Sequence, residues 1–213
     1  MSTTKLQTGS KPRMTSEERR TAITEAAARI FAEKGFRGTT TRELAAAVGV
    51  TEPVLYEHFR TKRDLYSAII GEKAQQGLAI LSALYERYAD AEDDVGFFNA
   101  LGNTLIQWYT EDSTFIRLLL FSNLEGHELK DLFHERSHEC FNVIAAYIDR
   151  RIEAGAMRPV NSSIAGRAFF GMVAHYALSG LIFGCAPFAE SPKEVVARMV
   201  DIFMKGMCKE ESK

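Results

Sequence analysis

The N-terminal part of the chain carries apolar residues at the spacing of amphipathic helices. Ile23, Ala27 and Phe31 fall on one face of a 3.6-residue period, and Gly35 follows as a residue that ends helices. A run of small residues then leads to Gly49, where we expect a sharp turn. Residues whose side chains cap helix starts stand at Thr15, Thr40, Thr51 and Thr61. The pattern predicts a head of three helices over residues 15–61.

The rest of the chain keeps a helical period, and no β-pattern appears after Lys62. The last two helix starts are well marked. One lies at Ser162 and Ser163, and the other at Ser191, where a capping box has proline at the first helical position. We therefore expect an all-α body over residues 62–213, with helices near 62–88, 95–110, 112–124, 127–154, 163–184 and 192–208.

The most informative segment runs from Thr40 to Lys62. It predicts two short helices joined by a tight turn, and the second of them ends in Tyr-x-His-Phe. This is the layout of a helix-turn-helix, which places one helix in the DNA major groove and anchors its flanks to phosphates. The alternative is an ordinary three-helix bundle, but such a bundle does not need a two-turn helix that presents threonine, tyrosine, histidine and lysine. The segment therefore predicts DNA binding.

Matching residues at fixed spacing extend this pattern from about Arg20 to Ile69. They include Gly35-Phe36, Thr39-Thr40-Thr41, Leu44-Ala45, Val48-Gly49-Val50-Thr51, Leu55-Tyr56, His58-Phe59, Lys62 and Leu65. In these positions the chain resembles the TetR/AcrR family of bacterial transcriptional regulators. The resemblance implies a helix-turn-helix DNA-binding domain at 15–61 and a ligand-binding and dimerisation domain at 62–213. It also implies a homodimer that binds a palindromic operator.

The resemblance assigns DNA contacts residue by residue. The groups that would donate to phosphate oxygens belong to Thr41, Thr51, Tyr56, His58 and Lys62. The residues that would lie nearest the bases are Arg42, Glu52, Pro53 and Val54. Most of the family has glycine at the position of Pro53 and a small polar residue at that of Val54. Neither side chain has a hydrogen-bond donor, so we expect apolar contact with a thymine methyl group.

The charges are unevenly distributed along the chain. Residues 1–66 hold 12 Lys and Arg against 8 Asp and Glu, whereas the remainder holds 14 against 20. The DNA-binding end is therefore basic and the body acidic, although the net charge is only −2. This distribution predicts binding to DNA that depends on dimerisation and weakens with salt.

The first residues and the cysteines bear on the cellular compartment of the protein. Residues 1–14 carry Lys5, Lys11 and Arg13 without an acidic residue, and they lack the apolar run of a signal peptide. They are expected to be a flexible basic arm, either solvated or reaching into a minor groove. The cysteines have no metal-ligand spacing and are expected to be reduced thiols, at positions 140, 185 and 208. A cytoplasmic protein without a cofactor is predicted.

The segment 168–189 contains no Lys, Arg, Asp or Glu and raises the alternative of a membrane span. Arg167 enters the same predicted helix, however, His175 and Ser179 interrupt it, and Pro187 ends it. A helix that is apolar all round can also be buried in a large soluble core. In proteins of the resembled family, the last two helices of each subunit form the dimer interface. We therefore expect the helices near 163–184 and 192–208 to pair in a homodimer, with no membrane contact.

The body is rich in aromatic residues, most of which must be core. The resembled family encloses a small-molecule effector in this region, and large apolar walls with a few polar groups suit a lipophilic or aromatic ligand. The candidate ligand-binding residues are Trp108, Phe121, Phe141 and Tyr176. The expected function is a repressor that such a ligand releases from DNA by tilting the helix 62–88. No enzymatic activity is expected.

One motif points to a different class of protein. His134-Glu135-Arg136-Ser137-His138 matches H-E-x-x-H, in which two histidines one helical turn apart bind zinc and the glutamate activates water. The alternative function is therefore a zinc-dependent hydrolase. A milder version is a metal or acidic effector bound by His127, His134 and His138, with His175 as a further candidate. No further metalloprotease signal follows, and we expect a solvated helix face with no catalytic residue and no bound metal.

Overall fold

The computed structural model describes residues 14–111, 113–124, 127–185 and 188–208, with residues 123, 127–137 and 181–183 described by their backbone only. These ranges contain nine α-helices and no strand, so the predicted all-α fold is confirmed. The helices are α1 Ser16–Lys34, α2 Thr41–Val48, α3 Glu52–His58, α4 Lys62–Ala89, α5 Asp94–Glu111, α6 Ser113–Leu124, α7 His127–Glu153, α8 Ser162–Phe183 and α9 Pro192–Met207. Their bounds lie close to those expected from the sequence.

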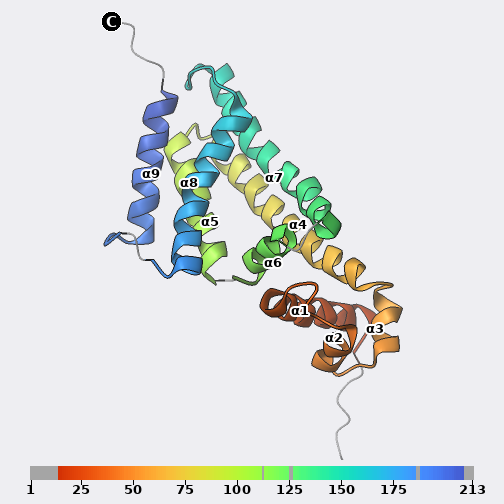
Figure 1. Cartoon of the computed structure of the whole chain (residues 1–213). Coiled ribbons are helices and arrows are strands. Elements are labelled where there is room, and N and C mark those ends of the chain that lie inside the picture. Colours follow the sequence, from red (N-terminus) through yellow and green to blue (C-terminus); the bar gives the residue numbers. More distant parts are fainter. Residues whose placement is uncertain (1–13, 112, 125–126, 186–187, 209–213) are drawn as a thin grey trace, which may run out of the picture.

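The head, residues 15–61, contains α1, α2 and α3 and lies at one end of the molecule (Figure 1). Its core is formed by fully buried side chains such as Phe31 and Leu44, together with Leu65 and Tyr66 from the first turns of α4. The Phe31 and Tyr66 rings meet edge to face with centroids 5.1 Å apart. The start of α4 is thus part of the head core.

The predicted capping boxes at Thr15 and Thr40 are present, and Gly49 adopts the left-handed conformation, with φ 73° and ψ 31°. The expected cap at Thr51 differs in one respect. Thr51 precedes α3, but its side chain makes no capping hydrogen bond. A capping oxygen accepts from the second or third amide of the helix, and Pro53 has removed the first of these two donors.

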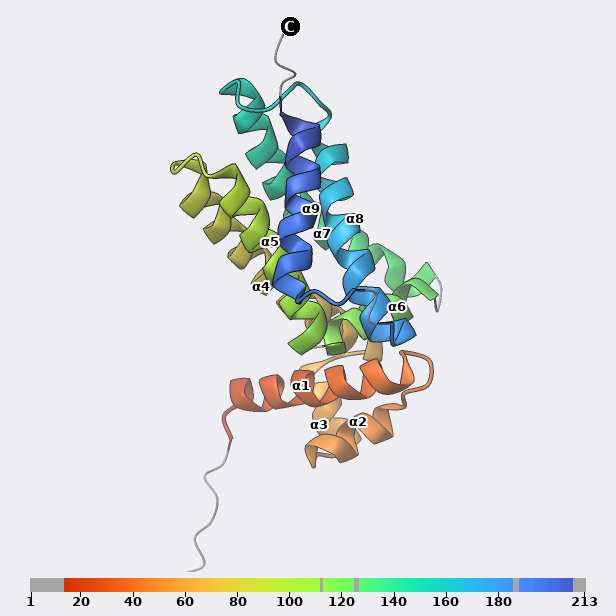
Figure 2. The ribbon, with the colours of Figure 1, turned by 90° about the vertical axis from the view of Figure 1, so that its left-hand side faces the viewer.

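In the body, residues 62–208 of the described chain, α4 packs against α5 and α7 (Figures 1 and 2). Helix α8 packs against α5 and α7, and α9 packs against α5 and α8. Aromatic rings fill its core: Phe97 stacks on Tyr147 with centroids 3.7 Å apart, and Phe98 contacts Phe169 edge to face. The start of α8 corrects the sequence prediction slightly. Its cap is Asn161, whose side chain accepts from the amide of Ile164.

The helix α6 lies between the head and the body and contacts α1 on one side (Figures 1 and 2). The helices α8 and α9 run side by side along one flank of the body, which faces the viewer in Figure 2. Within the described residues, none of the helices combines the length and the apolar character needed to cross a membrane.

Candidate functional site

Polar side chains tie the three helices of the head to one another. Lys34 of α1 pairs with Glu43 of α2, with 2.7 Å between Nζ and Oε1. The hydrogen bonds from Lys34 and Thr40 lower the pKa of Glu43 to about 2, so this carboxylate is ionised at neutral pH. Thr41 donates from Oγ1 to Oε2 of Glu52, at 2.7 Å, and thereby connects α2 to α3. The position of α3 is therefore set in part by Thr41 of α2.

Lys62 fixes the start of α4 to the loop between α1 and α2. Its Nζ donates to the carbonyl oxygens of Phe36 and Thr39, each at 2.7 Å, and lies 4.3 Å from the centroid of the Phe36 ring. The sequence had suggested a phosphate contact for Lys62. That contact stays a prediction, because the structure directs this ammonium group into the head.

Arg20 of α1 makes a similar connection at the C-terminal end of α3. Its Nη1 donates to the carbonyl oxygen of His58 at 3.0 Å, and its guanidinium group lies 4.2 Å above the centroid of the Phe59 ring. Sequence reasoning did not single out Arg20. The C-terminal end of α3 is thus held to α1 by Arg20, and its N-terminal end is held to α2 by the hydrogen bond between Thr41 and Glu52. Pro53 and Tyr56 of α3 remain exposed.

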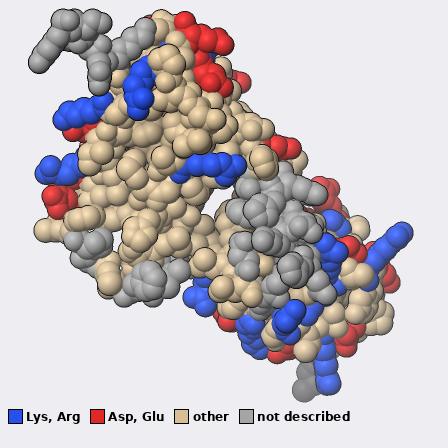
Figure 3. Space-filling view, turned by 45° about the horizontal axis from the view of Figure 1, so that its top comes forward, with Lys and Arg blue, Asp and Glu red and all other residues tan. Residues whose placement is uncertain are grey.

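Four of the predicted DNA-contact residues are exposed: Arg42, Thr51, Pro53 and Tyr56. The Tyr56 side chain is 45% accessible, a large fraction for an aromatic residue. Figure 3 shows basic and acidic side chains intermixed at the head end of the molecule, whereas much of the visible body surface carries no charge. An exposed arginine, Arg42, together with an exposed short helix fits the backbone and groove contacts that DNA requires.

The other predicted contacts are less accessible. Glu52, Val54 and His58 are half-buried, and so is Thr41. The hydroxyl proton of Thr41 is already donated to Glu52, so a phosphate could accept it only if this hydrogen bond were exchanged. The structure therefore gives Thr41 and Lys62 roles inside the domain. DNA contacts of the nine residues stay a prediction.

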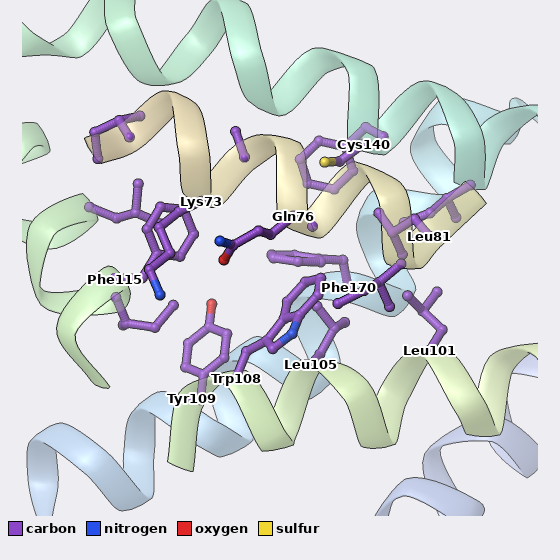
Figure 4. Close-up of a pocket in the computed structure, with 18 residues that line it drawn as sticks. Lys73, Gln76, Leu81, Leu101, Leu105, Trp108, Tyr109, Phe115, Cys140 and Phe170 are labelled. Carbon is purple, nitrogen blue, oxygen red and sulfur yellow. The ribbon is translucent and has the colours of Figure 1, made fainter. Parts of the chain in front are cut away.

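A cavity of about 230 Å³ lies between α4, α5, α6, α7 and α8 (Figure 4). Most of its wall is apolar, and the described residues that line it include no acidic side chain. The lining residues are Ile70, Lys73, Ala74, Gln76, Gly77, Ile80, Leu81, Leu101, Leu105, Trp108, Tyr109, Phe115, Ile116, Leu119, Cys140, Phe141, Ile144 and Phe170. An apolar cavity with a few polar groups has the character of a small-molecule site.

The polar groups of the cavity come from α4, α5 and α7. The side chains of Lys73 and Gln76 enter from α4, and the hydroxyl group of Tyr109 points toward them from α5 (Figure 4). Burial raises the pKa of Tyr109, which keeps its hydroxyl group protonated and able to donate. Burial, with Glu139 nearby, also raises the pKa of Cys140, so this thiol is neutral.

Two of the four predicted ligand-binding residues line the cavity. Trp108 and Phe141 are in its wall, whereas Phe121 and Tyr176 are not among the lining residues. The Tyr176 ring instead stacks on Phe188, with centroids 5.9 Å apart. Aromatic composition alone did not distinguish these positions. Lys73 and Gln76 were missed. Lys73 is a polar residue within an otherwise apolar stripe of α4, which is a detectable signal, whereas Gln76 is exposed and gave none.

The helix α6 touches the cavity with one face and the head with the other. Phe115 and Leu119 line the cavity and also pack against the head core, in which Leu118 is fully buried. The Leu118 carbonyl oxygen accepts from the hydroxyl group of Tyr66 at 2.7 Å, and Nε of Arg117 donates to the carbonyl oxygen of Ala32 at 2.6 Å. Sequence reasoning had considered only the helix 62–88 as the connection between ligand and head.

The flank formed by α8 and α9 carries exposed apolar side chains. Ile164 of α8 is 67% accessible and Ile202 of α9 is 65% accessible. On α8, Ala168, Gly171 and His175 are exposed along the same line of helical turns, and a methyl group added at Gly171 would meet nothing within 4 Å. Among the described residues of one chain, these positions of the flank are left exposed.

The H-E-x-x-H motif lies on α7, but the side chains of His134 and Glu135 are outside the described residues, as is that of His127. The described member, His138, is exposed. Among the residues whose side chains are described, no cluster of three or more His, Cys, Asp or Glu could hold a metal ion. The proposed basic arm also falls outside the description, apart from Met14.

Comparison with known proteins gives full-length structural matches and short sequence matches. The chain is 38% identical to the HTH-type transcriptional activator FasR of Mycolicibacterium smegmatis over 58 residues. This aligned segment covers 27% of this chain and 26% of FasR. The chain thus matches about a quarter of the length of this relative.

Two solved structures share the fold. One is a tetR-family regulator from Mesorhizobium loti, with a TM-score of 0.76 and 19% identity over 92% of this chain and all of that chain. The other is AibR in complex with isovaleryl coenzyme A and operator DNA, with a TM-score of 0.63 and 22% identity over 86% of this chain and 97% of that chain.

Two family matches cover the head and the body separately. Residues 23–69 match the bacterial regulatory proteins of the tetR family, and residues 99–206 match the C-terminal domain of AefR-like transcriptional repressors. The relatives and the structural neighbours are transcriptional regulators and not enzymes, which goes against the hydrolase alternative. Because the second match alone spans about half of the chain, the chain belongs to the tetR family of bacterial regulatory proteins.

Proposed function

We propose that this protein is a homodimeric transcriptional repressor that binds a palindromic operator and leaves it when a small apolar ligand fills the cavity. The observation that carries the proposal is the position of α6, whose Phe115 and Leu119 contact the cavity while Leu118 lies in the head core. A ligand and the DNA-binding surface therefore share one rigid element. A bacterial protein with this function acts in the cytoplasm, where its operator lies.

The DNA contacts follow from exposure. Arg42, Thr51 and Tyr56 are exposed and carry donors, so we assign them to phosphates and to the nearest base edges. Pro53 and Val54 offer only apolar surface to the major groove, which suits thymine methyl groups. Thr41 and Lys62 support the head from within and contribute to DNA affinity through its geometry.

Dimerisation through α8 and α9 supplies the symmetry that a palindrome requires. A two-fold axis between two copies would set their recognition helices roughly 34 Å apart, or a multiple of this distance. The exposed apolar side chains of Ile164 and Ile202 and the open position at Gly171 favour helix packing on this flank. In an isologous interface each of these residues is buried twice.

Release from DNA follows from the connection through α6. A ligand in the cavity presses on Phe115 and Leu119, and α6 transmits this displacement to α1 through the Arg117 hydrogen bond and to α4 through the Tyr66 hydrogen bond. The head would then move as one piece, which changes the separation of the two recognition helices. A coupling free energy of about 1–3 kcal/mol gives a 5- to 150-fold loss of operator affinity.

The relatives support a regulator but differ in the direction of regulation. FasR is an activator, whereas residues 99–206 match a family of repressors. AibR was crystallised with both isovaleryl coenzyme A and operator DNA. This supports an effector site and a DNA-binding site within one protein of this fold. We choose repression because the repressor match covers the body, where the ligand cavity lies.

The test is fluorescence anisotropy of the full-length protein with the DNA upstream of its own gene, titrated at several salt concentrations. We expect saturable binding to one palindromic fragment and a steep decrease of affinity with salt. Arg42→Ala and Tyr56→Phe should weaken this binding, and Arg87→Ala, which removes an exposed charge from the body, should not. Equal affinity of all four proteins for the fragment would refute the assignment of the head surface.

The direction of regulation needs a separate measurement. Transcription in vitro from the same fragment should fall when the protein is added. An increase in transcript would replace the repressor with an activator while leaving the DNA-binding assignment intact.

A further inference from the structure

We propose that the ligand of the cavity is a small monocarboxylic acid with an apolar tail, whose carboxylate binds between Lys73, Gln76 and Tyr109. This inference rests on the proposed function, because it takes the cavity as the effector site. It goes beyond that function by assigning a charge, an orientation and a size to the ligand. The expectation of a merely lipophilic or aromatic effector does not include a charged group.

The first observation is the convergence of three polar groups in one part of the cavity. Lys73 and Gln76 lie three residues apart on α4, so both side chains leave the same face of the helix. Tyr109 comes from α5, and its hydroxyl group points toward the Gln76 amide in Figure 4. All three lie at the end of the cavity next to Phe115 of α6, whereas Leu81 and Leu101 lie at the opposite end (Figure 4).

The second observation is the balance of charge in the wall. Lys73 is a half-buried cation, and no acidic residue is among the described residues that line the cavity. The Lys73 ammonium group would repel a cationic ligand, whereas a carboxylate would gain charge-assisted hydrogen bonds from it. An ammonium group carries three donors, so Lys73 can bind a ligand in addition to contacts that it makes within the chain. Gln76 and the protonated Tyr109 hydroxyl group add neutral donors.

The third observation is the apolar remainder of the cavity and its size. Beyond the three polar groups, the wall is formed by side chains such as Leu101, Leu105, Ile144 and Phe170. The volume of about 230 Å³ is that of roughly eight waters at ~30 Å³ each. It is also smaller than the sites of drug-sized molecules, which begin near ~300 Å³. The tail is therefore a short aliphatic chain or a single ring.

This orientation places the charged group of the ligand beside the helix that contacts the head. Phe115 lies next to Lys73 at the same end of the cavity, and it also packs against the head core. A carboxylate that reorganises the Lys73 side chain therefore acts directly on α6. The apolar tail would occupy the Leu101 end of the cavity, away from Phe115 and α6.

The experiment uses the only tryptophan of the chain as the reporter, because Trp108 lines the cavity. The full-length protein is titrated with octanoate and with octanol, which have the same chain length but differ in charge. The same titrations are made with Lys73→Met, which keeps the length of the side chain, with Lys73→Arg, which keeps its charge, and with Arg87→Met as a control on the same helix.

We expect the wild-type protein to bind octanoate at least about tenfold more tightly than octanol, since a hydrogen bond to a charged group contributes ~1.5–3 kcal/mol. Lys73→Met should remove this preference and leave octanol affinity unchanged, while Lys73→Arg and Arg87→Met should keep it. Equal affinity for both ligands in the wild-type protein, or a preference that survives in Lys73→Met, would overturn the proposal. So would the absence of saturable binding along the whole series from butanoate to decanoate.

Operator binding measured in the same samples separates this inference from the proposed function. If octanoate binds with the expected preference but leaves operator affinity unchanged, the ligand class stands and the release mechanism fails. If octanol releases the operator as well as octanoate does, the release mechanism stands and the carboxylate assignment fails.

Discussion

Replacing Ile202 with serine should dissociate the proposed dimer without unfolding the chain. Burying an isoleucine side chain completely contributes ~1.5–3 kcal/mol. Ile202 is 65% accessible in the single chain, so about two thirds of that contribution, ~1–2 kcal/mol, is left for a partner. An isologous interface counts the residue twice, which gives ~2–4 kcal/mol per dimer and raises the dimer Kd about 30- to 700-fold.

The assay is sedimentation equilibrium of the wild-type protein and of Ile202→Ser over a range of concentrations. The control is Val95→Ser, because Val95 is a similarly exposed apolar residue, 52% accessible, on α5. Circular dichroism should report the same helix content for all three proteins. The reasoning is refuted if Ile202→Ser shifts the dimer Kd no more than Val95→Ser does, since the flank of α8 and α9 would then not be the interface.

Three further changes test the contacts within the chain. Tyr66→Phe removes the buried hydrogen bond to the Leu118 carbonyl oxygen and should lower the free energy of unfolding in urea by about 1 kcal/mol. It should also reduce the loss of operator affinity that the ligand causes. An unchanged ligand response would remove this bond from the coupling. The pKa of Glu43 is lowered from 4.5 to about 2, so its stabilising contribution is complete above pH 4.5 and is lost as the pH falls toward 2. Thermal melts of the wild-type protein should show this loss more strongly than those of Glu43→Gln, and parallel pH profiles would contradict it. Gly102→Ala would place a methyl group 2.7 Å from a methyl carbon of Val196 and should lower the free energy of unfolding in urea by ~1–3 kcal/mol. The double mutant Gly102→Ala/Val196→Ala should recover part of this loss. A wild-type unfolding midpoint in the single mutant would show that α9 moves aside without cost.

Helix starts could be predicted from the sequence because capping depends on residues a few positions apart. The boxes at Thr15, Thr40 and Ser191 were expected and are present. The two differences are equally local. Pro53 removes one of the amides that a capping threonine uses, and Asn161 caps α8 one position before the expected serine.

The cavity could be predicted only as a region. Which side chains line it depends on how α4, α5, α6 and α7 pack, and this packing brings together residues far apart in sequence. Trp108 and Tyr176 are both aromatic residues on body helices, yet one lines the cavity and the other stacks on Phe188. For the same reason Lys62, which the family pattern assigns to DNA, has long-range contacts within the head that no local pattern reveals.

The side chains that hold the head together at Lys62 and Arg20 are different from the outer residues Pro53 and Val54 of α3. DNA recognition and the response to ligand can therefore change separately. Lys62 fixes the start of α4 and Arg20 fixes the C-terminal end of α3, whereas Pro53 and Val54 take part in neither set of bonds. The outer residues can therefore be exchanged to recognise another DNA sequence while the response to ligand is retained. Helix α4 is about 40 Å long at ~1.5 Å per residue, so a ligand that tilts it by ~5° displaces its head end by ~3.5 Å. New operators and new effectors can accordingly be acquired independently, each by substitutions in a different part of the chain.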